Sequence, residues 1–118
     1  MIKKEIQFYR KSDGDCPVES FLDSLPAKVA QKAVWVLNLI EALDRVPAHY
    51  FCKLADTDDI WEFRIKFGSN IYRVFAFFDG HRVIVTHGFI KETQKTPREE
   101  IEKAENFKKD YFQRKQGR

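Results

Sequence analysis

The chain has 118 residues, a length typical of one domain with a single hydrophobic core. Charged side chains make up 33% of it, and no apolar run approaches the roughly 18 residues of a membrane-spanning helix, so the sequence excludes membrane insertion through such a helix. The net charge of +3 lies entirely from residue 91 onward, where nine Lys and Arg oppose six acids. This basic end indicates a solvated helix face, the commoner case, or a surface that attracts nucleic acid or an acidic partner.

The N-terminus carries two lysines but lacks the apolar segment of a signal peptide, so we expect a cytoplasmic protein. Cys16 and Cys52 belong to no Cys-x-x-Cys pair, which gives no support to a zinc site and predicts two reduced thiols. The chain has no glycine-rich phosphate loop either, and we expect neither a metal nor a small-molecule cofactor.

The chain begins with a predicted strand over residues 2–9, in which Ile6 and Phe8 share one face. A turn follows at residues 11–15. Pro17 suits the first turn of a short helix, because its missing N–H would have no helical partner there.

Pro26 ends this first helix, and the strongest helical pattern in the chain then runs from Ala27 to about Arg45. Its apolar stripe is wide, which predicts packing against both a helix and a sheet. Residues 48–59 predict a connection, with three acids that indicate a polar loop rather than a metal cluster: Asp56, Asp58 and Asp59.

Three strands follow, beginning with the strict alternation of residues 60–67. Gly68-Ser69 and Asp79-Gly80 predict two-residue hairpin loops. With these loops Phe67 pairs with Asn70 and Phe78 with His81, so that Arg64 lies across from Arg73, and Arg73 across from Thr86. The helix-covered face then holds Trp61, Phe63, Ile65, Tyr72, Val74, Ala76, Val83 and Val85, and the polar face Glu62, Arg64, Lys66, Arg73, Arg82 and Thr86.

Phe75, Phe77 and Ile84 also fall on the polar face, so part of that face must be covered or adhesive. Residues 96–99 predict a capping box with proline at the first position of a terminal helix that runs to about Arg114. We therefore expect a single α+β domain over residues 1–118. Its small, twisted, mainly antiparallel sheet is an N-terminal strand plus a three-strand meander, flanked by two N-terminal helices and one C-terminal helix.

Arg64 and Arg73 are the strongest candidates for function, since two arginines that face each other repel unless an anion lies between them. Glu62 is expected to serve only one of them at a time. A guanidinium offers a planar fork of donors that matches phosphate oxygens. On the residues alone, a phosphate site and ordinary surface ion pairs are equally good interpretations.

The three histidines are spread over the chain and lie near no nucleophile pattern. His87 falls on the helix-covered face of the predicted sheet, where a hydrogen-bonded structural histidine is commoner than a catalytic one.

Several segments, taken in order, resemble the HigB-like, phage-derived branch of the RelE/ParE toxin superfamily, and together they cover nearly the whole chain. They are Cys16-Pro17-Val18 with Phe21-Leu22, Leu54, Ile60-Trp61-Glu62-Phe63-Arg64, Ile71-Tyr72-Arg73, Asp79-Gly80, His87-Gly88-Phe89-Ile90-Lys91, Thr93-Gln94-Lys95-Thr96-Pro97 and Glu100-Ile101-Glu102-Lys103-Ala104.

The resemblance implies a RelE-like fold and the toxin of a type II toxin–antitoxin pair. RelE- and HigB-type members enter the ribosomal A site and cut mRNA without a metal, by attack of the 2′-hydroxyl on the adjacent phosphate. The implied partners are therefore mRNA on the ribosome and a small antitoxin with a DNA-binding helix-turn-helix.

The resemblance also assigns residues. Arg73 matches the family's strand arginine, Arg64 the basic residue of the preceding strand, and Lys91 the basic residue after the last strand. Glu62 and Lys91 are both candidates for proton transfer. The further RNA contacts that we expect are Lys66, Arg82 and Lys95.

Two other functions stay open on the sequence. The protein could inhibit a protein target, as the gyrase-poisoning ParE side of the superfamily does. It could also be a toxin relic or binding module that pairs with an antitoxin and cuts nothing.

Overall fold

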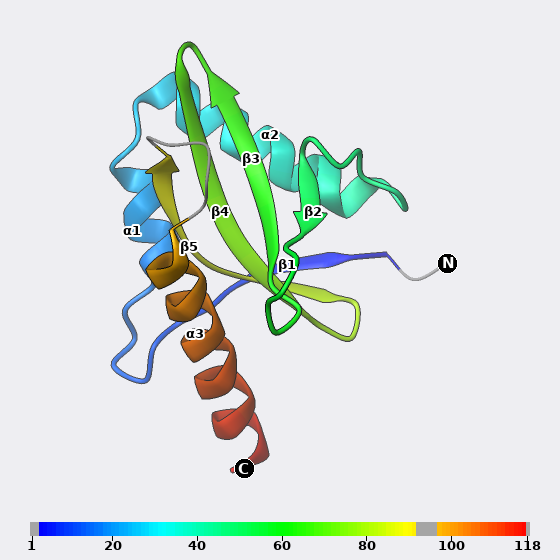
Figure 1. Ribbon diagram of the computed structural model, residues 1–118, viewed down its shortest axis with the longest axis vertical. Helices are drawn as coiled ribbons and strands as arrows, with labels where there is room; N and C mark the ends of the chain where they lie inside the picture. Colours follow the sequence, from blue (N-terminus) through cyan, green and yellow to red (C-terminus); the bar gives the residue numbers. More distant parts are fainter. Residues whose placement is uncertain (1–2, 92–96, 118) are drawn as a thin grey trace.

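The computed structural model describes residues 3–91 and 97–117, which form one five-stranded sheet with helices on both faces (Figure 1). The elements are β1 (Glu5–Phe8), α1 (Pro17–Asp23), α2 (Ala27–Ala42), β2 (Phe51–Lys53), β3 (Trp61–Phe67), β4 (Asn70–Asp79), β5 (Arg82–Lys91) and α3 (Arg98–Gln116). The strand order is β1-β5-β4-β3-β2, and only the β1–β5 pairing is parallel among these described strands. The predicted α+β class is confirmed.

The two faces of the sheet carry two separate cores. The first lies between the sheet and helices α1 and α2, and it contains every strand residue that the alternation assigned to the helix-covered face. The second lies under α3, where Phe75, Phe77 and Ile84 are fully buried together with Ala104. Helix α3 is thus the cover that these apolar residues on the polar face require.

Helix α2 is shorter and more exposed than its apolar pattern predicts. It ends at Ala42, because Leu43 adopts an extended conformation. Its buried stripe is narrow and consists of Val29, Ala33, Val36, Leu37 and Ile40. Trp35 remains half-exposed and meets Tyr50 edge-to-face, with ring centroids 5.6 Å apart. The predicted packing of this helix against both a helix and the sheet is confirmed, but the buried stripe is narrower than the apolar pattern.

Residues 48–59, predicted as a connection, contain the short edge strand β2. It pairs antiparallel with β3, and its buried Phe51 stacks on Trp61 with ring centroids 4.8 Å apart. A strand of three residues is too short to show alternation, which is why the sequence pattern does not reveal it.

The two hairpins differ in how well their loops were predicted. In the first, Phe67 pairs with Asn70 and Arg64 with Arg73, as predicted. In the second, Asp79 pairs with Arg82, so the loop is Gly80-His81 and the predicted register was wrong by one residue on each strand. Both loops place a glycine with positive φ first, at 62° for Gly68 and 60° for Gly80. A glycine in that place is typical of a type II′ turn.

A bulge in β5 changes the register again. Ala76 pairs with Val85, but Val74 pairs with Gly88, so β5 has one more residue than β4 in this interval. An extra residue reverses which face the following side chains occupy. Arg73 therefore lies across from Phe89 rather than Thr86.

The bulge also corrects the placement of His87. Its ring lies on the α3 side of the sheet, and its ring centroid is 5.1 Å from the centroid of Phe75 and 5.5 Å from the centroid of Phe107. The predicted position on the opposite face assumed a regular β5.

Helix α3 begins at Arg98, with Pro97 as its N-cap residue, one position later than predicted. The Thr96 side of the predicted capping box lies outside the described residues. None of the described helices is long and apolar enough to cross a membrane. Both cysteines are free thiols, Cys16 buried and Cys52 half-buried.

Candidate functional site

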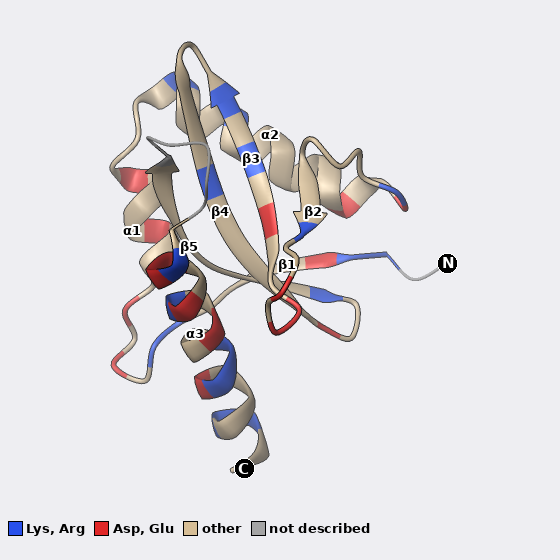
Figure 2. Cartoon of the chain, in the orientation of Figure 1, with Lys and Arg blue, Asp and Glu red and all other residues tan. Residues whose placement is uncertain are grey.

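The part of the α3-side face nearest the β3–β4 hairpin carries the basic residues predicted from the sequence. Figure 2 shows basic segments of β3 and β4 side by side there, with an acidic segment of β3 next to them. Cross-strand pairing places Arg64 directly opposite Arg73, and Glu62 two residues along β3 from Arg64. The arginine cluster is defined here as Glu62, Arg64 and Arg73.

Glu62 links the two arginines through one oxygen. Its side chain is fully buried, and its Oε1 accepts hydrogen bonds from Arg73 Nη1 at 2.5 Å and from Arg64 Nε at 3.2 Å. The expectation that Glu62 serves one arginine at a time was wrong. The shared carboxylate offsets the repulsion between the guanidinium groups and fixes their relative position.

Arg73 is the buried member of the pair, with 6% of its surface exposed. Among the described residues its Nε has no hydrogen-bond partner, although the atom is buried. A buried donor without an acceptor costs about 1–3 kcal/mol. An acceptor that reached this nitrogen would recover that free energy, which makes Arg73 a natural site for an anionic oxygen.

Arg64 forms the solvent-facing side of the cluster. Its side chain is 39% exposed, and its Nη2 lies 3.8 Å from Cys52 Sγ on the neighbouring strand. A thiol is a weak acceptor, so most of the donor capacity of this guanidinium remains available to a ligand. The cluster therefore has one arginine within reach of solvent and one beneath it.

Lys66 and Lys91 lie in a row of paired residues two positions beyond Arg64 along β3. The exposed Lys66 pairs with Ile71, and Ile71 pairs on its other side with Lys91, the last residue of β5. The row of Arg64, Arg73 and Phe89 lies two residues away along the strands, on the same face of the sheet. The backbone thus brings three basic positions of β3 and β4 close to that of Lys91, while Lys95 lies outside the described residues.

Comparison with known proteins identifies the family of this chain. Residues 20–109 match the family described as Phage derived protein Gp49-like (DUF891). The chain belongs to the Gp49-like family. This family is associated with RelE- and HigB-type toxins. The matched segment of the Gp49-like chain includes the whole arginine cluster. No curated protein matches the chain.

Arg82, predicted as a further RNA contact, is not part of the arginine cluster of this Gp49-like protein. It pairs with Asp79 at the opposite end of β4, so about 20 Å separate it from Arg73 along the strand. Its side chain is exposed and lies 4.0 Å from Glu5. The sequence placed Arg82 on the correct face but gave no information on how far along the sheet the site extends.

A buried polar chain beside the bulge was missed by the sequence reasoning. Thr86 Oγ1 lies 3.2 Å from His87 Nδ1, and His87 Nε2 lies 3.1 Å from Glu100 Oε1 on α3. Burial lowers the pKa of His87 to about 4, although the neighbouring carboxylate of Glu100 acts in the opposite direction. No sequence signal marks the bulge that brings these groups together.

The described residues contain no group of three or more His, Cys, Asp or Glu side chains that could hold a metal ion. The acids Asp56 and Asp59 have positive φ values of 58° and 53°, as is common for Asp in tight loops. Asp59 forms an ion pair with Lys53 at 2.6 Å.

Proposed function

We propose that this Gp49-like protein is the toxin of a type II toxin–antitoxin pair and that it cuts mRNA on the ribosome. The association of the family with RelE- and HigB-type toxins supports the toxin assignment. The arginine cluster supports a reaction at phosphate, because guanidinium groups match phosphate oxygens in charge and geometry.

The observation that carries the proposal is the pair of guanidinium groups on one Glu62 oxygen, with no acceptor for Arg73 Nε in the part of the chain that the structure describes. During attack on a phosphodiester the phosphorus becomes pentacoordinate and its oxygens gain negative charge. Fixed cations that contact these oxygens stabilise the transition state more than the ground state. Because Arg73 is 6% exposed, the proposal requires the side chains around it to shift when RNA binds.

The reaction that fits these groups is attack by the neighbouring 2′-hydroxyl of the RNA. The 2′-oxygen forms a bond to phosphorus, and the bond from phosphorus to the 5′-oxygen of the next nucleotide breaks. The products carry a 2′,3′-cyclic phosphate and a 5′-hydroxyl, so one proton leaves the 2′-oxygen and one reaches the departing oxygen. Arginine stays protonated throughout, which restricts Arg64 and Arg73 to holding the phosphate.

Glu62 has a different role in this proposal from the proton transfer suggested by the sequence. Its carboxylate is fully buried and bound to both arginines, so we assign it the positioning of these two groups. Lys91 is then the remaining candidate for proton transfer among the residues named from the sequence. A substitution Lys91→Arg, which keeps the charge but cannot release a proton, separates proton transfer from simple attraction.

The test uses induced expression and mapping of mRNA ends on translating ribosomes. We expect new 5′ ends with wild-type protein and none with Arg73→Ala. The control is Arg98→Ala, which removes one positive charge from the exposed start of α3, where Arg98 pairs only weakly with Glu102 at 3.6 Å. Growth arrest with unchanged transcripts would exclude the cleavage reaction, and inhibition of purified gyrase in a supercoiling assay would then favour a protein target.

The toxin assignment has a second test that does not depend on cleavage. We expect the product of the adjacent open reading frame to carry a helix-turn-helix and to restore growth when it is expressed together with this protein. An adjacent gene that fails to restore growth contradicts the paired toxin–antitoxin arrangement.

A further inference from the structure

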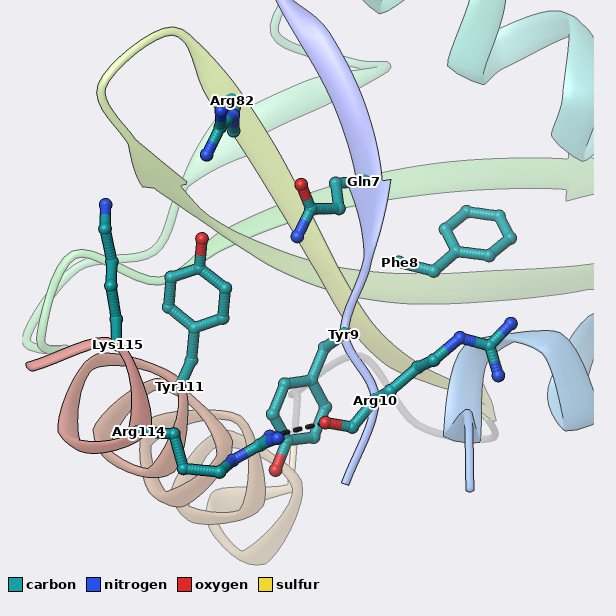
Figure 3. A pocket seen from close by; sticks show the side chains of 8 residues that line it. All are labelled: Gln7, Phe8, Tyr9, Arg10, Arg82, Tyr111, Arg114 and Lys115. Carbon is teal, nitrogen blue, oxygen red and sulfur yellow. Dashed lines mark hydrogen bonds between the residues drawn. The ribbon is translucent and has the colours of Figure 1, made fainter. Parts of the chain in front are cut away.

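A second basic site lies at the far end of the molecule, in a cavity of about 320 Å³ between β1, β5 and the C-terminal end of α3 (Figure 3). We call it the β1–α3 cavity. It is lined by Gln7, Phe8, Tyr9, Arg10, Arg82, Tyr111, Arg114 and Lys115. Four of these residues are cations and none is a carboxylic acid.

The acids that balance these cations lie outside the lining. Lys115 pairs with Asp79 at 2.7 Å, Arg114 with Asp110 at 2.7 Å, and Arg82 approaches Glu5 at 4.0 Å. The side chains of Arg82 and Glu5 are 44% and 60% exposed. Exposed ion pairs contribute little free energy, so Arg82 leaves Glu5 for a stronger anion at low cost.

One wall of the cavity is held firmly in place. Arg114 Nη2 donates to the Arg10 carbonyl at 2.5 Å and to Asp110 at 2.7 Å, and the guanidinium carbon lies 5.7 Å from the centre of the Tyr9 ring. Tyr9 is 3% exposed and its hydroxyl donates to Asp110 at 2.5 Å. These contacts join the end of β1 to α3 and preform the cavity before any ligand arrives.

The groups that point into the open space come from three elements. Figure 3 shows the Gln7 amide, the Arg82 guanidinium, the Tyr111 hydroxyl and the Lys115 ammonium directed toward the same region. The lining itself holds no acid, but the Tyr111 hydroxyl and the Lys115 ammonium each donate to Asp79 Oδ2 at 2.7 Å just outside it. Convergent donors of this kind, with two full positive charges, match the oxygens of a phosphate group.

The volume indicates how much of a ligand fits. Small-molecule sites span roughly 300–1,000 Å³, and the β1–α3 cavity falls at the lower end of that range. It therefore has room for a phosphate together with part of what carries it. The half-buried Tyr111 ring in the lining provides an apolar surface for that part, whereas the Phe8 ring points away from the cavity (Figure 3) and Tyr9 is 3% exposed.

We propose that the β1–α3 cavity binds the phosphate of a ligand about the size of one nucleotide, with Arg82 and Lys115 as its charged contacts. The ligand is either a free mononucleotide or one nucleotide unit of an RNA strand. The cavity is separate from the arginine cluster, since Arg82 and Arg73 lie at opposite ends of β4. Of the residues that line it, only Arg82 lies within the segment matched by the Gp49-like family.

The test is an NMR titration of the isotope-labelled full chain, observed at the backbone amides of Gln7, Arg82 and Tyr111. The probes are inorganic phosphate, adenosine 5′-monophosphate, and a five-nucleotide RNA with 2′-O-methyl groups, which lacks the attacking hydroxyl. The variant Arg82→Gln/Lys115→Gln is compared with Arg98→Gln/Lys109→Gln, which removes the same charge from exposed positions of α3 outside the cavity. Thermal unfolding verifies that both variants are folded.

We expect the nucleotide or the RNA to shift the cavity amides of the wild-type protein and of the control. In Arg82→Gln/Lys115→Gln we expect the affinity to fall by about tenfold or more. Binding of the mononucleotide identifies a free nucleotide as the ligand, and binding of the RNA without the mononucleotide identifies a strand. The proposal is overturned if no probe shifts these amides, or if the control loses as much affinity as the cavity variant.

This inference does not rest on the proposed function. The titration contains no ribosome and no cleavable RNA, so a protein that cuts nothing can still satisfy it. Conversely, a protein that cuts mRNA but binds no phosphate in the cavity would contradict this inference and still support the proposed function.

Discussion

His87 makes the stability of this protein depend on pH in a way that can be calculated. Its pKa is about 4 in the folded protein because it is buried, compared with an ordinary value of 6.5. Below pH 6.5 the unfolded chain therefore binds a proton that the folded protein excludes. Stability is at its full value above pH 6.5, falls as the pH drops from 6.5 to about 4, and receives no further loss from this group below that.

The size of this loss follows from the two pKa values. The interval from 6.5 to about 4, at about 1.4 kcal/mol for each pH unit, corresponds to about 3 kcal/mol. The charged neighbours are Glu100, which favours the protonated imidazole, and Lys103, which opposes it. The burial effect exceeds the attraction to Glu100, which is why the pKa is lowered.

The substitution His87→Gln isolates this effect, because an amide keeps a hydrogen-bonding side chain that does not titrate. The free energy of unfolding is measured with urea from pH 7 to pH 4. We expect the wild type to lose about 3 kcal/mol more than His87→Gln over this interval. His49→Gln, at an exposed position, is expected to follow the wild type. Parallel curves for the wild type and His87→Gln would refute the reasoning.

Three further predictions concern the two cores and the arginine cluster. Gly88→Ala should lower the free energy of unfolding by about 1–3 kcal/mol, because the added Cβ would lie 2.5 Å from the Phe21 ring. In a Phe21→Ala background the same substitution should lower it by clearly less. Equal costs in both backgrounds would contradict this contact. Glu62→Gln should lower the free energy of unfolding measured with urea by about 3 kcal/mol, since it leaves two facing guanidinium groups without their shared carboxylate. The control, Glu102→Gln at an exposed position, should change it by less than about 0.5 kcal/mol. Burial is the main reason that the pKa of Tyr9 is raised to about 12, so the neutral phenol stabilises the fold below pH 10 and this contribution is lost as the pH rises to 12. Circular dichroism at alkaline pH should show this loss of stability in the wild type and not in Tyr9→Phe.

Regular features of the sheet were predictable from the sequence, because strict alternation of apolar and polar residues assigns each strand residue to one face. The alternation in β3 assigned the correct face to Trp61, Phe63 and Ile65, and the Gly68 loop fixed the pairing of Arg64 with Arg73. The same alternation showed that Phe75 and Phe77 need a cover, which α3 provides.

Irregular features were not predictable, and each has a physical cause. Asp79-Gly80 is a strong turn signal, but the turn places Gly80 first rather than second, which moves the hairpin by one residue. The bulge at Thr86 and His87 contains no glycine or proline that would mark it. Both arginines reach Glu62 Oε1 within 3.2 Å because of the side-chain conformations, which strand pairing alone does not determine.

The β5 bulge has a consequence for insertions and deletions. It puts Phe89 on the α3 side, where its ring stacks on Phe75 with centroids 5.6 Å apart, and it leaves Ile90 across from Tyr72 on the other face. Removal of one residue from the bulge would exchange these two faces for the rest of the strand. A one-residue deletion between Val85 and Gly88 should therefore do more damage than a substitution at either residue, because it reassigns every later side chain of β5 at once.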